Sequence, residues 1–251
     1  MDGRKRWQVV LGLIPPAALA GALILFDSLA QPPAYHEFAD RRPLAGIPNF
    51  ADVASNLAFL VPGLLGLRLC LARRPDGALP AWTLFFTGLI AVTFGSAYYH
   101  WSPGNGTLVW DRGAMAVAFM GLYVALLAEY AGARLERPLV LPAVILGAAT
   151  VLYWHWTGDL RPYFALQGAV FASALVMLAT MESVFRQKAY IVGALGLYAA
   201  AVAFEQLDRE LFALTGGVIA GHAVKHCLAG LAGYRVYRML RARGGGQAQQ
   251  A

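Results

Sequence analysis

The sequence predicts an all-α fold, a polytopic bundle of transmembrane helices. Of the 251 residues, 59% are hydrophobic and only 14% are charged, whereas an average soluble domain has about 25% charged residues. The apolar residues come in blocks of about 20, the length of helix that crosses a hydrocarbon core of about 30 Å. Lysine and arginine also alternate between the connecting segments, as they do in membrane proteins.

Apolar runs bounded by polar, proline and glycine residues predict eight spans. These cover residues 8–30, 48–71, 80–101, 108–130, 138–157, 162–184, 188–206 and 216–239. With this division, fourteen of the 20 lysines and arginines fall on the side that holds both chain ends, five fall on the other side, and Lys225 lies inside the last span. Because cytoplasmic segments retain positive charge, both termini are predicted to be cytoplasmic.

Three regions are predicted along the chain. Residues 1–47 would hold an N-terminal transmembrane helix and an outer loop, residues 48–240 a seven-helix core, and residues 241–251 a disordered cytoplasmic tail. The start of the chain, Arg4-Lys5-Arg6 before an apolar run, also resembles a signal peptide. The apolar stretch is longer than an h-region of about 7–15 residues, which favours a retained helix.

The distribution of basic residues and the short loops bear on partners and location. The basic residues form short clusters between apolar blocks instead of a continuous patch, so no binding to nucleic acid is predicted. Short loops favour a bacterial inner membrane as the location.

Three histidines are predicted to meet at the periplasmic side of the membrane. His222 and His226 are four residues apart in one predicted helix, so their imidazoles project from one face and could share a metal. His100 ends an outward-going span, at the same depth as the start of the last span. A lone intramembrane histidine is often a packing residue or part of a proton relay, but three that converge favour a metal. Three histidines and a water are the open arrangement of catalytic zinc.

Other polar residues lie at the same predicted depth or near it. Ser96 stands one helical turn before His100, and Asp111 opens the returning span. Lys225 cannot bind a metal as a cation and is expected to pair with a carboxylate such as Asp52 or to extend toward an interface. Glu205 is expected to be the polar end of a span or a buried partner. His36 is expected in a solvated outer loop, and His155 at the membrane interface.

Several short motifs are similar to those of the alkaline ceramidase family. This family belongs to a superfamily of seven-helix membrane hydrolases that includes the progestin and adipoQ receptors and the GPI-anchor remodelling hydrolases. The resemblance runs from about Asn49 to Tyr234. The matching pieces are Asp52-Val53-Ala54-Ser55-Asn56, Gly95-Ser96-x3-His100, Asp111, Leu207-Asp208-Arg209, and His222-x3-His226 followed by Leu228, Gly230 and Tyr234.

The resemblance implies a zinc-dependent intramembrane amide hydrolase. It implies that His100, His222 and His226 hold Zn²⁺, that Asp111 acts on the zinc-bound water, and that Ser96 supports the site. Residues Asp52 and Asp208 lie in matched motifs and are candidate supporting residues. The implied substrate is a membrane lipid of the ceramide type, cleaved at its N-acyl bond to a fatty acid and a sphingoid base.

The chain departs from the family in three places. The helix at 8–30 precedes the family's seven, and Lys225 stands where the ceramidases often carry an aromatic residue. The family's acidic calcium site before its first helix is not reproduced residue for residue. The oxygens of Glu37, Asp40 and Asn49 could still bind Ca²⁺, and the alternative is an ordinary polar loop.

Three other functions stay open from the sequence. A lipid ester hydrolase, such as a phospholipase, would use the same zinc machinery. A receptor or binding protein would hold zinc without catalysis. A transporter would use the intramembrane histidines and aspartates as a proton relay, but the absence of an inverted repeat in the sequence disfavours it.

Overall fold

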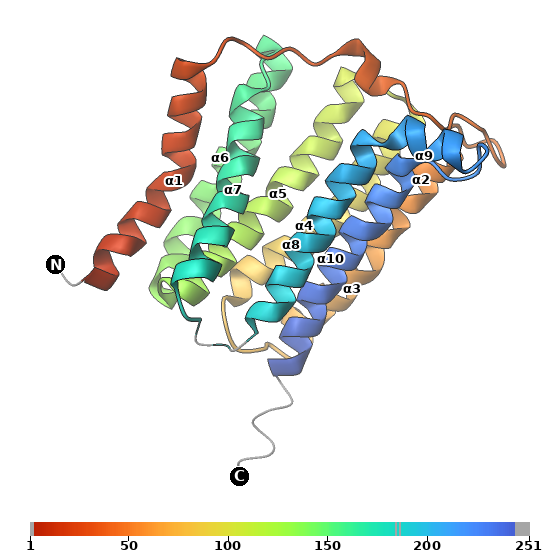
Figure 1. The fold of residues 1–251 in the computed structure, drawn as a ribbon. Helices are drawn as coiled ribbons and strands as arrows, with labels where there is room; N and C mark the ends of the chain where they lie inside the picture. Colours follow the sequence, from red (N-terminus) through yellow and green to blue (C-terminus); the bar gives the residue numbers. More distant parts are fainter. Residues whose placement is uncertain (1–2, 184, 186, 244–251) are drawn as a thin grey trace. The chain divides into compact units, whose positions relative to one another are not determined.

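The computed structural model describes residues 3–183, 185 and 187–243, and its regular elements there are helices (Figure 1). Apart from two isolated bridges, this part of the chain holds no β-structure, which confirms the all-α prediction. The elements are α1 (Gly3–Leu25), η1 (Pro33–His36), α2 (Phe50–Ser55), α3 (Leu57–Ala72), α4 (Leu79–Trp101), α5 (Asn105–Tyr130), η2 (Ala133–Leu135), α6 (Glu136–Thr157), α7 (Arg161–Thr180), α8 (Lys188–Gln206), α9 (Asp208–Leu214) and α10 (Gly221–Arg243).

Six helical segments in the described residues are long and apolar enough to cross a membrane, which fits a multi-pass membrane protein. They are Phe50–Ala72, Leu79–Trp101, Asn105–Tyr130, Ala133–Thr157, Arg161–Thr180 and Lys188–Gln206. The first and last of the eight predicted spans are helices as well, but α1 shows only a shorter apolar stretch, Leu13–Leu25. The count of eight crossings therefore stays a prediction.

The structure ends two helices, α7 and α10, at other residues than the sequence predicted. The sixth predicted span, 162–184, ends as a helix at Thr180, where the backbone of Met181 becomes extended. Helix α10 continues to Arg243, so residues 241–243 are helical where the sequence predicted the start of a disordered tail. Arg241 and Arg243 lie in its last turn, where basic side chains interact favourably with the helix dipole. The rest of the predicted tail lies outside the described residues.

The chain divides into two compact units. The first comprises Met1–Gln31, Asp76–Phe85 and Ala116–Lys188, and the second comprises Pro32–Pro75, Phe86–Met115 and Ala189–Ala251. These divisions do not coincide with the boundaries at 47 and 240 that the sequence predicted. All the candidate site residues fall within the second unit, so the geometry of the site can be described in one compact body.

In the first unit, buried carboxylates hold the start of α4. The Glu129 carboxylate accepts a hydrogen bond from the Trp82 indole at 2.7 Å, and the Glu136 carboxylate accepts one from the backbone N–H of Ala81 at 2.9 Å. Backbone N–H groups in the first turn of a helix lack partners within the helix. The two glutamates therefore satisfy polar groups that apolar surroundings would leave unpaired.

In the second unit, the packing of α10 on α3 sets the position of the site (Figure 1). The two helices approach closely at Gly230, where a Cβ atom would lie 2.5 Å from the carbonyl oxygen of Ala58. A second close approach is between α3 and α4, because a Cβ at Gly66 would overlap the ring of Phe86. Small residues at such crossings let helices pack closely in a membrane, where burial of apolar surface gives no driving force between helices.

One face of α3 carries exposed apolar side chains. Leu57, Val61 and Leu64 are 60%, 56% and 52% exposed, and their spacing of four and three residues places them on one side of the helix. An exposed apolar stripe of this kind is unfavourable in water. We therefore interpret it as a surface that faces lipid.

We expect Gly230→Ala to destabilise the protein because the added methyl group meets the backbone of Ala58 and not a movable side chain. The free energy of unfolding should fall by about 1–3 kcal/mol. The matched control is Gly196→Ala, because a Cβ at that position in α8 meets nothing within 4 Å. Thermal unfolding in detergent would show a lower midpoint for the first variant only, and equal midpoints would contradict the tight α3–α10 contact.

Candidate metal centre

His100 from α4 and His222 and His226 from α10 converge to one point in the second unit. All three are buried. Each offers a ring nitrogen, and these three atoms lie within 4.8 Å of one another. The ring centroids are 4.7 Å apart for His100 and His222, 5.0 Å for His100 and His226, and 4.9 Å for His222 and His226. The predicted ligand set is thus brought together by two helices that are far apart in the sequence.

Ser55 orients the ring of His226. Its Oγ lies 2.8 Å from His226 Nδ1 and donates to the carbonyl oxygen of Asp52 at 3.1 Å. A hydroxyl group has one hydrogen to donate, so a Ser55 that donates to Asp52 accepts from His226, and this arrangement assigns the proton of His226 to Nδ1. Nε2 then keeps its lone pair. Fixing the tautomer in this way is the usual role of a residue behind a metal ligand, although the sequence analysis gave Ser55 no role.

Asp208 holds the start of α10 at His222. One carboxylate oxygen accepts from the backbone N–H of His222 at 2.8 Å, and the other accepts from the N–H of Ala39 at 2.9 Å. A carboxylate at a helix N-terminus satisfies an unpaired N–H and interacts favourably with the helix dipole. Gly221 permits this contact, because a Cβ there would overlap the backbone of Phe204 and Asp208.

His100 is held through its backbone while its ring is left to face the other two. The side-chain amide of Asn49 donates to the carbonyl oxygen of His100 at 2.8 Å. The ring of Phe38 covers the centre, with centroids 4.6 Å from that of His100 and 5.2 Å from that of His222. Neither ring nitrogen of His100 has a hydrogen-bond partner in the described part of the chain.

The three imidazoles fit a transition metal such as zinc. A buried nitrogen without a partner is unfavourable by about 1–3 kcal/mol, and metal coordination would remove this penalty for His100. Zinc binds imidazole nitrogens at about 2.0–2.1 Å, and three neutral histidines are a known catalytic ligand set. The cluster could therefore hold a metal ion, and a tetrahedral ion would draw the three nitrogens to about 3.4 Å from one another.

Ser96 and Asp111 form a pair in the same unit. Both are buried, and the Ser96 hydroxyl is hydrogen-bonded to the Asp111 carboxylate. Their helices touch here, since a Cβ at Gly95 would lie 2.6 Å from the carbonyl oxygen of Trp110. The sequence predicted that both residues lie at the depth of the histidines, and the structure joins them in one hydrogen bond.

Lys225 pairs with Glu205 and not with Asp52, the carboxylate that the sequence analysis offered. Its Nζ lies 2.5 Å from Glu205 Oε1, with both side chains largely buried, and the Tyr35 hydroxyl donates to the same oxygen at 3.4 Å. Helix α8 brings Glu205 to this face of α10. Of the two roles expected for Glu205, the structure shows the buried partner.

Asp52 lies inside the unit without such a partner. The residue is fully buried, and neither carboxylate oxygen has a hydrogen-bond partner among the described residues. Its backbone carbonyl accepts from Ser55 and from the side-chain amide of Asn56 at 2.8 Å. The support that Asp52 gives the site in the structure thus comes from its main chain.

The remaining histidines stand apart from the cluster. His36 is half-buried, with Nδ1 3.0 Å from the Tyr99 hydroxyl and Nε2 3.0 Å from Asn105 Oδ1. The sequence predicted a solvated side chain here, and the structure gives it two protein partners. His155 is exposed near the end of α6, and the interface role expected for it stays a prediction.

The candidate calcium ligands each have another partner. Asp40 binds Arg42 through two contacts of 2.8 and 2.6 Å, and this pairing holds the pKa of Asp40 below its usual value. Glu37 lies 3.8 Å from Arg41 and 3.4 Å from Arg209. Asn49 uses its amide N–H on His100. Calcium would have to compete with these arginines, and the calcium site stays a prediction.

Comparison with models of known protein families finds no match, and comparison with curated proteins finds no significant relative.

We predict that Ser55→Ala lowers metal affinity by about 10–100-fold without abolishing binding, because it removes the hydrogen bond that fixes the His226 ring. His226→Ala should abolish stoichiometric binding. Ser173→Ala is the matched control, since Ser173 is buried in the first unit and its Oγ makes no hydrogen bond in the described residues. Zinc titration with a competing chelator gives the affinities. If Ser55→Ala binds as tightly as the unaltered protein, the tautomer argument is wrong.

Proposed function

We propose that this protein is a zinc-dependent intramembrane hydrolase that cleaves the N-acyl bond of ceramide-type lipids. The observation that carries the proposal is the convergence of three buried histidines in the unit that also holds the buried Asp111–Ser96 pair. A metal site with three protein ligands leaves a coordination position open, whereas structural zinc sites are usually closed by four. The resemblance to the alkaline ceramidases supports the same chemistry.

The metal site, Asp111 and Ser96 have separate roles in the proposed hydrolysis. Zinc, when bound, supplies a Lewis acid that favours deprotonation of water and polarises a carbonyl group. Asp111 takes the proton of the attacking water, as general bases of this type do. Ser96 donates to Asp111 and so restrains the orientation of the carboxylate that acts as the base.

Proton and bond changes balance in a single cycle. Water adds its oxygen to the acyl carbon, and the carbon–nitrogen bond breaks. Asp111 then passes the proton that it took to the leaving nitrogen. The products are a fatty acid and a sphingoid base, and Asp111 returns to its starting state as a carboxylate.

A lipid substrate suits the surroundings of the centre. His100 lies at the end of α4, a helix long and apolar enough to cross a membrane, and Phe38 and Phe59 pack against the histidines. The first turns of α3 expose the apolar stripe Leu57, Val61 and Leu64. An acyl chain lying along this stripe would bring its carbonyl group to the histidine end of the helices.

Asp111→Asn should separate metal binding from catalysis. An amide cannot accept the proton of the attacking water, so we expect turnover to fall by about 10²–10⁴-fold with zinc content unchanged. Asp27→Asn makes the same chemical change at an exposed position in the first unit and should retain full turnover. Product formation and metal content are measured on the same purified samples, and full turnover in Asp111→Asn would place the base elsewhere.

The decisive experiment is mass-spectrometric product analysis of the metal-quantified protein in detergent. Ceramide and phospholipid are offered separately, each with and without a chelator. Chelator-sensitive release of fatty acid from ceramide is the expected result. Release from phospholipid alone would replace the proposal by an ester hydrolase, and stoichiometric zinc without any product would favour a receptor or binding protein.

A further inference from the structure

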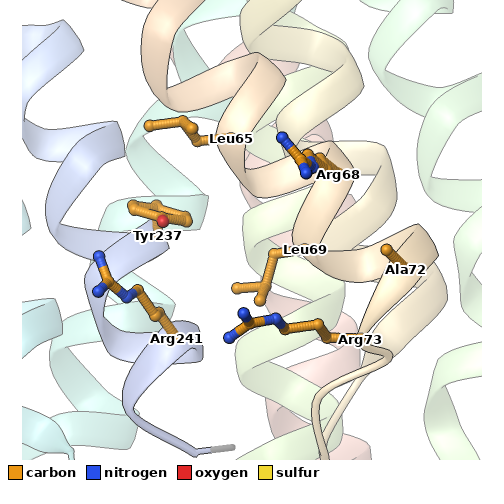
Figure 2. A pocket seen from close by; sticks show the side chains of 7 residues that line it. All are labelled: Leu65, Arg68, Leu69, Ala72, Arg73, Tyr237 and Arg241. Carbon is orange, nitrogen blue, oxygen red and sulfur yellow. The ribbon is translucent and has the colours of Figure 1, made fainter.

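The second unit contains a cationic pocket at the end of α3 and α10 opposite the histidines. The cavity has a volume of about 270 Å³ and is lined by Leu65, Arg68, Leu69, Ala72, Arg73, Tyr237 and Arg241 (Figure 2). Along α10, Arg241 is fifteen residues from His226, or about 22 Å at 1.5 Å per residue. The pocket is therefore separate from the candidate metal centre.

Three arginines surround this pocket, and no carboxylate lines it. Arg73, the residue that follows α3, extends toward α10 (Figure 2), Arg241 lines the pocket from α10, and Arg68 lies about one and a half turns before Arg73. Within residues 3–183, 185 and 187–243, none of the three forms an ion pair with aspartate or glutamate. Like charges around one cavity repel, so an anion bound in it would stabilise the arrangement.

The positive charge at this end of the helices also follows from membrane topology, but topology requires only a number of basic residues on one side. It does not require that arginines from the end of α3 and from α10 line one cavity. Arg238, on the same helix, is exposed and does not line the pocket. Membrane topology alone therefore does not explain why the other three arginines line one cavity, whereas a bound anion would explain it.

Guanidinium groups recognise phosphate through paired hydrogen bonds. Tyr237 adds a hydroxyl group, which can donate to a phosphate oxygen. The wall of the pocket is apolar, because Leu65, Leu69 and Ala72 form the α3 side. Leu65 and Ala72 are exposed at the end of a helix that can span a membrane, so lipid can reach the cavity from the side.

We propose that this pocket binds the phosphate-bearing headgroup of an anionic phospholipid. Arg73 and Arg241 hold the phosphate between α3 and α10, and Arg68 and Tyr237 contact its outer oxygens or the glycerol. The first carbons of the acyl chains lie against Leu65. Basic pockets between transmembrane helices on the cytoplasmic side are a recurrent site for anionic lipid headgroups.

The test is native mass spectrometry of the full-length protein in detergent, titrated with phosphatidylglycerol. Arg73→Gln combined with Arg241→Gln should weaken the first lipid-binding event at least tenfold, because two charge-assisted hydrogen-bonding groups are removed. Arg238→Gln removes one charge from α10 outside the pocket and should change binding less than twofold. Arg241→Lys keeps the charge but loses the paired geometry, and an intermediate loss is expected.

Two further arms identify the source of the phosphate. Inorganic phosphate at a concentration equal to that of the lipid should not displace it, and phosphatidylcholine should bind more weakly. Displacement by inorganic phosphate would overturn the lipid assignment in favour of a soluble phosphate. Unchanged phosphatidylglycerol binding by the double variant would overturn the site itself. Zinc content, measured on every sample, reports on the intact fold at the other end of the same helices.

Discussion

Much of the second unit is arranged to hold three buried histidines in place while a ring nitrogen of each stays near a common point. Ser55 satisfies Nδ1 of His226, Asp208 holds the backbone at His222, and Asn49 holds the backbone at His100. Ser55 and Asn49 come from segments distant in sequence from the histidines that they position, and Asp208 lies 14 residues before His222. The tight contacts at Gly221 and Gly230 fix the position of α10 along its axis against its neighbours. That position determines whether Ser55 and Asp208 lie within hydrogen-bond distance of α10.

Lys225, the charged residue next to His226, also has a partner that favours metal binding. A lysine one residue before His226 would repel a divalent cation, and Glu205 compensates this charge at 2.5 Å. A buried ion pair of this kind is seldom a large source of stability, because both charges have to leave water. Its effect here is electrostatic, because Glu205 neutralises the lysine charge that would otherwise oppose metal binding at the histidines. The far ends of α3 and α10 show the opposite case, in which arginines gather without carboxylates.

The sequence predicted the helical fold and the pair His222 and His226 because both rest on local periodicity, and it predicted His100 beside them from the direction of the spans. Apolar blocks reveal the helices, and a spacing of four puts His222 and His226 on one face whatever the tertiary structure. The partners of those residues depend instead on the rotation of one helix against another. The sequence therefore predicts only that Lys225 pairs with a carboxylate such as Asp52 or extends toward an interface, whereas the structure pairs it with Glu205 of α8. Ser55 is 171 residues from His226, and no pattern within one helix could have indicated that contact.

A cluster that served only packing would be arranged differently. Apolar side chains fill a helix interface without polar atoms, and histidines that pack there close their hydrogen bonds on each other or on the backbone. Here the donor of His226 is directed away from the cluster to Ser55, while His100 keeps both nitrogens free of protein partners in the described residues. Lone pairs turned toward one point are what a metal ion requires of neutral imidazoles. With three such ligands instead of four, and with a carboxylate–serine pair in the same unit, the arrangement favours a reacting centre over a structural one.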